Sequence, residues 1–141
     1  MFGQALRNLF GPAPGLAPGQ PVTSTPAFRV MRVFNPNGLI GVDDGNICMV
    51  EDCTDPDGRM YRIEYQSTPD ARHAIAWCRY SPWGSVSQPH TINGGMICIG
   101  AGAHDSRPGH SRYDLETVIR RARFWCTAVS VYHETGEFPN A

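Results

Sequence analysis

The sequence predicts an α+β domain in which an antiparallel β-meander packs on one long C-terminal helix. Between residues 28 and 80, short runs of apolar and polar residues are separated by turns rich in Pro, Gly, Asn and Asp. Between residues 115 and 132, apolar residues instead recur at helical spacing. Short strands joined by such turns favour antiparallel pairing, and a helix is then needed to cover the apolar face of the sheet.

Each strand of the meander is predicted from a run bounded by turn signals. The first run ends at the Asn-Pro-Asn-Gly sequence of residues 35–38. An Asp-Pro-Asp-Gly turn joins the second and third runs and predicts a hairpin over residues 46–65. We expect the inner face of the sheet to carry Ile63, Ile75 and Trp77. The four predicted strands comprise residues 28–34, 46–50, 60–65 and 73–80.

The last element is the most regular helix in the sequence. Ser111 or Asp114 is suited to cap its start, and Gly136 with Pro139 ends it. Cys126 lies on the apolar stripe and is interpreted as structural, because free thiols are usually buried. The stripe consists of Leu115, Val118, Ile119, Ala122, Cys126 and Val129, widened by Trp125 and Tyr132.

The chain divides into an N-terminal region, residues 1–27, and a domain, residues 28–141. Phe2, Leu6 and Phe10 follow helical spacing and predict a short amphipathic helix. The Pro/Gly-rich stretch that follows holds neither a helix nor a central strand, so it is predicted to form an extended arm.

Composition excludes several classes of function. The 141-residue chain has a formal net charge of −1 and no basic stripe that would neutralise several phosphates, so no nucleic-acid partner is expected. Its one dense basic group, Arg120, Arg121 and Arg123, is interpreted as a solvated helix face. No apolar run approaches the ~20 residues of a membrane span, and no signal-peptide core is present. We therefore expect a cytoplasmic protein without a membrane partner.

The cysteines indicate reduced thiols rather than a disulfide framework or a metal centre. Their number is odd, and their spacings match no disulfide or zinc pattern. No metal and no cofactor are therefore predicted, and reduced thiols are the usual state in the cytosol. The five are Cys48, Cys53, Cys78, Cys98 and Cys126.

Reactive groups concentrate around Cys98. The imidazole of His90, the carboxamide of Asn93 and a glycine pair precede this thiol within the stretch 89–100. A thiolate near neutral pH requires positive potential, backbone N–H donors or an adjacent base, and these neighbours are candidates to supply them. The plainer interpretation is a short buried strand over residues 96–99, with Cys98 a small inert hydrophobe.

The same stretch resembles the active site of ubiquitin-conjugating enzymes. In that family a His-Pro-Asn element precedes a glycine, an apolar residue, the cysteine and another apolar residue. Here Pro89-His90 and Asn93 precede Gly-Met-Ile-Cys-Ile at residues 95–99. The order of elements is similar too: an N-terminal segment, an antiparallel meander, the His/Asn element, the cysteine and a helix.

The C-terminal part resembles the bacterial members more specifically. Phe124-Trp125, Tyr132 and the Thr-Gly-Glu-Phe-Pro sequence at 135–139 are similar to the helix and the tail with which those members end. The resemblance covers roughly residues 28–139. It implies a ubiquitin-conjugating-enzyme-like fold, with the Cys98 loop between the meander and the helix.

Two spacings depart from the family pattern. Asn93 follows His90 by three positions rather than two, and Pro89 precedes the histidine rather than following it. The interval from His90 to the cysteine is shorter as well. Asn93 therefore matches either the oxyanion asparagine of the family or its later Asn-Gly, whereas Cys98 is the firmest match.

The resemblance implies a conjugating enzyme in which Cys98 carries the C-terminus of a protein as a thioester, which a target lysine then attacks. Asn93, or backbone N–H groups of the glycine turn, would stabilise the oxyanion. His104, Asp105 or His90 would take the proton from the lysine amine.

Bacterial members occur in anti-phage operons, and this implies the partners. Some lie beside an activating enzyme and a ubiquitin-like carrier, others beside a cyclic-oligonucleotide synthase whose own C-terminus is conjugated. A short single-domain form resembles those that act with such a nucleotidyltransferase. The carrier is thus expected to be a ubiquitin-like protein or the C-terminus of a cyclic-oligonucleotide synthase.

Two other functions stay open. A cysteine hydrolase would pair Cys98 with His104 or His90 and let water resolve the acyl-enzyme. Asp105 is a poor orienter for His104, because neighbouring side chains in an extended loop point apart. A non-catalytic binding module on the same scaffold would resemble the inactive family members that lack the cysteine, and the thiol present here argues against it.

Overall fold

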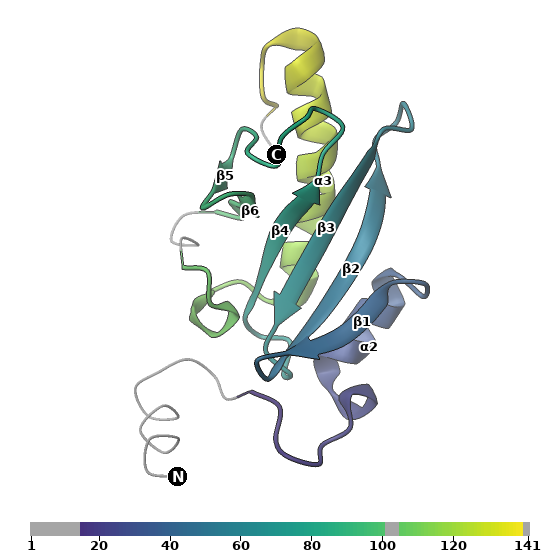
Figure 1. Ribbon diagram of the computed structural model, residues 1–141, viewed down its shortest axis with the longest axis vertical. Coiled ribbons are helices and arrows are strands. Elements are labelled where there is room, and N and C mark those ends of the chain that lie inside the picture. Colours follow the sequence, from purple (N-terminus) through teal and green to yellow (C-terminus); the bar gives the residue numbers. More distant parts are fainter. Residues whose placement is uncertain (1–14, 101–104, 140–141) are drawn as a thin grey trace.

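The computed structural model describes residues 15–100 and 105–139, which form one antiparallel sheet with helices on one of its faces (Figure 1). The strand order is β1-β2-β3-β4-β6-β5. This confirms the predicted α+β class, the antiparallel meander and the C-terminal helix. In chain order the elements are η1 (Val22–Ser24), α2 (Pro26–Phe34), β1 (Leu39–Asp43), β2 (Asn46–Thr54), β3 (Met60–Ser67), β4 (Ala74–Tyr80), β5 (Thr91–Ile92), β6 (Met96–Ile97), η2 (Pro108–His110) and α3 (Leu115–Thr135).

The central hairpin lies where the sequence predicts it. β2 and β3 pair from Ile47 opposite Ser67 to Thr54 opposite Met60, and β4 follows with the predicted bounds almost unchanged. The edge strand β1 was not predicted. Its residues are mostly exposed on both faces, so the apolar alternation that indicates a strand is weak there.

The strand predicted at residues 28–34 is wrong, because these residues belong to helix α2. The hydroxyl of Thr25 accepts a hydrogen bond from the Phe28 N–H at 3.2 Å, and Pro26 occupies the first turn, where its missing N–H costs nothing. Ala27 and Met31, one turn apart, are fully buried. The alternation of Arg and apolar residues fits a strand as well as a helix. The Thr-Pro start signal decides between them, and it lies just before residue 28.

Helix α3 forms as predicted, with Asp114 rather than Ser111 as its cap. The Asp114 carboxylate accepts from the Thr117 N–H at 2.8 Å. At the other end Gly136 adopts φ +81 and its N–H donates to the Tyr132 carbonyl. Cys126 is 1% exposed, which agrees with its interpretation as a structural residue.

The inner face of the sheet, which packs on α3, differs in part from the prediction. Ile63 is fully buried there and pairs with Cys78 of β4. Trp77 pairs instead with Glu64, so Trp77 and Ile75 lie on the opposite face and the prediction is wrong for both. Side chains alternate along a strand, and the face they take depends on a register that pairing sets.

The basic group of α3 is only partly a solvated face. Arg120 forms an exposed ion pair with Glu116 within the helix, as such a face would. Arg123 instead reaches the carboxylate of Glu51, a β2 residue that is 4% exposed. Arg121 is exposed, as that interpretation expects, although its guanidinium also binds the Ile99 carbonyl beside Cys98. The interpretation fails for Arg123, because Glu51 of β2 lies within reach of its long side chain.

The N-terminal region meets the sheet at the β1–β2 turn, where the Leu16 N–H donates to the Gly45 carbonyl at 2.7 Å. The helix predicted near Phe2, Leu6 and Phe10 falls in residues 1–14, outside the described residues. Across residues 15–100 and 105–139, none of the helices combines the length and the apolar character that a membrane span requires.

Candidate active site

A small hairpin, β5 and β6, extends the sheet beyond β4 and leads directly into Cys98. Its turn is built from Asn93, Gly94 and Gly95, which all have positive φ. Gly95 adopts φ +116, and a Cβ there would lie 2.7 Å from the Cys78 carbonyl oxygen. The same glycine accepts a 2.7 Å hydrogen bond from the Cys78 N–H. Glycine is therefore required for the hairpin to approach β4 this closely.

Two further hydrogen bonds fix the chain on either side of the hairpin. The Cys98 N–H donates to the His90 carbonyl at 2.9 Å, and the Trp125 indole N–H donates to the Pro89 carbonyl at 2.9 Å. The first bond holds the residue after β6 beside the loop that precedes β5. The second attaches that loop to α3, so Cys98 has a defined position between the sheet and the helix.

Cys98 lines a pocket of about 400 Å³. The side chain is half-buried, unlike those of Met96 and Ile97 in β6, which are buried. The interpretation as a buried strand therefore holds for β6 but not for Cys98, which lies just past its end. The lining comes from the loop before β5, from α3 and from the segment after α3: His90, Cys98, Ile99, Arg121, Phe124, Trp125, Phe138 and Pro139.

Burial disfavours the thiolate form of Cys98. Burial raises its pKa above the ordinary value of 9.0. Within residues 15–100 and 105–139, its sulfur forms no hydrogen bond or ion pair that would favour the thiolate. The expected activating groups, His90, Asn93 and the glycine N–H groups, thus form no hydrogen bond with the thiol.

The structure brings His90 to the pocket but not Asn93. The His90 ring stacks on Phe138, with centroids 4.1 Å apart and planes 28° from parallel. Asn93 is exposed at the tip of the hairpin and does not line the pocket. The proposed role of Asn93 as oxyanion donor would thus require a ligand that reaches the tip.

Of the two candidate bases after Cys98, His104 and Asp105, the structure describes only Asp105. His104 lies outside the described residues. Asp105 accepts hydrogen bonds from the backbone and guanidinium N–H groups of Arg107 at 2.9 Å, and its other oxygen lies 2.7 Å from His110 Nδ1. Arg107 first, and then His110, hold the pKa of Asp105 well below its usual range. A carboxylate so stabilised is a weak proton acceptor at neutral pH.

Arg121 and Phe138 are pocket residues that sequence reasoning missed. Arg121 donates through Nη1 to the Ile99 carbonyl at 2.9 Å, next to Cys98. It precedes Trp125 by four positions in α3, and residues four apart share one helix face. That spacing is the signal that would have identified Arg121. Phe138 reaches the pocket because the left-handed Gly136 ends α3 and reverses the chain, and no pattern in the sequence indicates that reversal.

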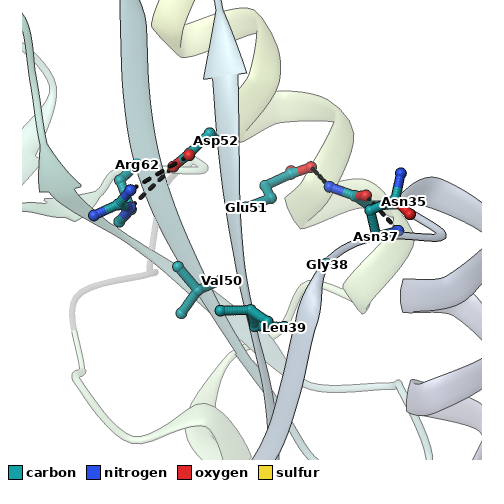
Figure 2. A pocket seen from close by; sticks show the side chains of 8 residues that line it. All are labelled: Asn35, Asn37, Gly38, Leu39, Val50, Glu51, Asp52 and Arg62. Carbon is teal, nitrogen blue, oxygen red and sulfur yellow. Dashed lines mark hydrogen bonds and ion pairs between the residues drawn. The ribbon is translucent and has the colours of Figure 1, made fainter.

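A second pocket, of about 620 Å³, lies between the α2–β1 connection and β2 (Figure 2). Figure 2 shows the side chains of Glu51 and Asp52 leaving the strand in opposite directions. Glu51 accepts from the Asn35 amide at 3.2 Å, and Asp52 accepts from Arg62 at 2.9 Å. No thiol and no imidazole line this pocket, so the Cys98 pocket is the better candidate for a reaction.

The described part of the chain contains no group of three or more His, Cys, Asp or Glu side chains that could hold a metal ion. Cys48 and Cys53 belong to opposite faces of β2, since their positions differ by an odd number. These two thiols therefore do not converge on one ligand.

Comparison with models of protein families, with curated proteins and with solved structures gives no match to this chain. Its function therefore has to be inferred from its own residues, from their geometry and from the resemblance of the Cys98 segment.

Proposed function

We propose that the protein is a conjugating enzyme of the ubiquitin-conjugating type. It carries a protein C-terminus as a thioester on Cys98 and transfers it to a lysine amine. The observation that supports this most directly is the position of Cys98. Its half-buried thiol lines a pocket, immediately after the last strand of the sheet and beside α3.

The order of the elements supports the same fold type. An N-terminal segment is followed by the meander β1 to β4, the hairpin that carries the His/Asn element, Cys98 and α3. This is the order expected from the resemblance to ubiquitin-conjugating enzymes.

The reaction comprises two acyl transfers. In the first, the Cys98 sulfur loses its proton and attacks the thioester carbonyl of the incoming carrier, and the departing thiolate takes up a proton. In the second, a lysine amine attacks the Cys98 thioester. The new C–N bond forms, the C–S bond breaks, and the ammonium proton passes to a base while Cys98 is released.

Both transfers pass through an oxyanion that needs donors close to Cys98. Arg121 is a candidate that lines the pocket, because its guanidinium has more N–H groups than the one bound to Ile99. The N–H groups of the glycine turn, the backbone alternative, lie with Asn93 at the hairpin outside the pocket, so they would act only on a ligand that reaches the turn. His90, which lines the pocket, is the described candidate for the base.

The surroundings of His90 favour a carrier over a hydrolase. A cysteine hydrolase needs a histidine held by a carboxylate or a carboxamide. His90 stacks on Phe138, and its ring contacts no carboxylate within the described residues. Asp105 is already bound to Arg107 and His110.

The resemblance to ubiquitin-conjugating enzymes suggests the carried protein and the operon in which the enzyme acts. The carried protein would be a ubiquitin-like protein or the C-terminus of a cyclic-oligonucleotide synthase, within an anti-phage operon and in some systems with an activating enzyme. The pocket has apolar surfaces from Ile99, Trp125 and Phe138, which suit an extended peptide tail. Its volume lies within the usual range of ligand sites, about 300–1,000 Å³.

Intact mass spectrometry tests the proposal. The protein is co-expressed with the products of the genes that flank its own and is analysed with and without a thiol reductant. We expect a protein adduct that reductant removes, that Cys98→Ala abolishes and that the matched variant Cys48→Ala retains. An adduct that survives in Cys98→Ala, or no adduct on any cysteine, would contradict the proposal.

A further inference from the structure

Two thiols that the proposed reaction does not use face each other between β2 and α3. Cys126 of α3 is 1% exposed and belongs to the hydrophobic core, and the half-buried Cys53 of β2 packs against that core. The nearby Cys53 thiol, and then burial, raise the pKa of Cys126. The contacts between β2 and α3 bring the two residues close to each other.

The packing of the strand and the helix explains this proximity. Glu51, two residues before Cys53 on the same face of β2, binds Arg123, three residues before Cys126 in α3. β2 and α3 run in the same direction (Figure 1). Two residues beyond Glu51 in the strand and three residues beyond Arg123 in the helix therefore lead to Cys53 and Cys126, on the same side of the ion pair. Tyr61, opposite Cys53 in β3, continues the same contact by bonding Ser130 of α3 at 2.6 Å.

Only one of the two thiols is open to reagents. A pocket of about 510 Å³ is lined by Cys53 together with Arg123 and Thr127. Cys126 does not line it and is closed off by the core. A small oxidant that enters this pocket therefore reaches Cys53 first, whereas Cys126 lies on the core side.

We propose that Cys53 and Cys126 form a peroxide-sensitive modification site that closes to a disulfide between β2 and α3. Cys53 sulfur attacks the O–O bond of a hydroperoxide, giving sulfenic acid and one molecule of water or alcohol. The Cys126 sulfur then attacks the sulfenic sulfur, the S–S bond forms, and a water molecule leaves. The two thiols lose two electrons and two protons in total, and the peroxide is reduced.

Disulfides join Cα atoms about 4.4–6.8 Å apart, and α3 packs on β2 with Cα atoms of the two elements within 8 Å of each other. The residue before Cys126 is Trp125, which lines the Cys98 pocket and binds the Pro89 carbonyl. The cross-link would thus fix the helix that supports Cys98, although the proposal does not depend on the reaction of Cys98.

The test uses the full-length reduced protein, treated with hydrogen peroxide at neutral pH. Free thiols are then alkylated under denaturing conditions, and the protein is mapped without reduction. We expect a mass loss of about 2 Da, equal to two hydrogens, a Cys53–Cys126 linked peptide pair, and reversal by dithiothreitol. The melting temperature of the oxidised protein should rise, because the link restricts the unfolded chain.

Two variants control the experiment. Cys53→Ser should abolish the link and leave Cys126 fully alkylated, whereas Cys48→Ser, on the opposite face of the same strand, should keep it. Cys53→Ala repeats the test if the serine variant does not fold by circular dichroism. A dominant link from Cys53 to another cysteine would overturn the proposal, as would sulfinic acid on Cys53 with Cys126 still a free thiol.

Discussion

Arg123 of α3 and Glu51 of β2 form a 2.7 Å ion pair that connects the helix to the sheet. The same guanidinium donates to the Phe34 carbonyl at the end of α2, at 2.9 Å. The Tyr65 hydroxyl donates to the second oxygen of Glu51, and Asn35 donates to the first. This network joins both helices to the centre of the sheet.

Arg123→Met should lower the free energy of unfolding by about 3 kcal/mol, because it leaves the Glu51 carboxylate buried without its cation. The matched variant is Arg120→Met, three positions earlier in the same helix, whose exposed pair with Glu116 is worth at most about 0.5 kcal/mol. Urea denaturation followed by circular dichroism measures both values. Equal losses in the two variants would show that the Glu51–Arg123 pair has no special role.

The network also predicts loss of stability in acid. Burial alone would raise the pKa of Glu51, but hydrogen bonds from Arg123, Tyr65 and Asn35 outweigh it and lower the pKa below the ordinary 4.5. The unfolded chain therefore takes up this proton at a higher pH than the folded chain. The contribution of Glu51 is complete above about 4.5 and is lost as the pH falls below it.

Denaturation curves between neutral pH and acid measure this loss. Other carboxylates with a lowered pKa also make the free energy of unfolding depend on pH in acid. The contribution of Glu51 to that dependence is therefore taken as the difference between wild type and Arg123→Met. Without the arginine, burial dominates and the Glu51 contribution to the slope should shrink or reverse. Identical slopes in the two proteins would contradict this assignment. The other lowered groups are Asp55, Asp70 and Asp105.

Gly95→Ala should destabilise the hairpin that presents Cys98. Its φ of +116 is a region that L residues rarely adopt, and the new Cβ would lie 2.7 Å from the Cys78 carbonyl. We expect a loss on the order of 2–3 kcal/mol. Gly94→Ala is the matched control: φ is +78 and no atom lies within 4 Å of its Cβ, so the cost should be about 1 kcal/mol. Thermal melts compare the two, and a larger cost at position 94 would refute this geometry.

Alkylation should show that the Cys98 thiol is not activated in the isolated protein. Because burial raises its pKa above 9.0, iodoacetamide should label Cys98 slowly at neutral pH, with a rate that rises through pH 9 and beyond. Mass mapping of labelled peptides, with Cys98→Ala to identify the site, gives the profile. Rapid labelling with a midpoint below pH 8 would mean that an activating group acts on the thiol.

Part of the regular structure could be predicted from the sequence, where local patterns determine it. The stripe of α3 with its Asp114 and Gly136 ends, and the turn between β2 and β3, are properties of neighbouring residues. Helix α2 was mistaken for a strand because its decisive signal, Thr25-Pro26, lies outside the run of apolar residues. The face of the sheet on which Trp77 lies depends on its pairing with Glu64. The sequence of a single strand does not contain that pairing.

The candidate site could be predicted only as far as Cys98 and His90, which are close in the chain. The pocket around them depends on long-range packing: Trp125 binds Pro89, and Phe138 stacks on His90 after the chain reverses at Gly136. Such contacts follow from how α3 lies on the sheet. Composition and spacing do not reveal them.

The most direct test of the central claim is the variant Cys98→Ser, co-expressed with the products of the flanking genes and compared with wild type and Cys98→Ala by intact mass. A serine oxygen in place of sulfur should trap the same protein C-terminus as an ester, which thiol reductant does not remove. Cys98→Ala should fold normally, since the half-buried side chain loses little buried volume, and should show no adduct. An adduct that has the same mass in all three proteins, and that thiol reductant removes equally from each, would contradict the assignment of Cys98 as the carrier residue.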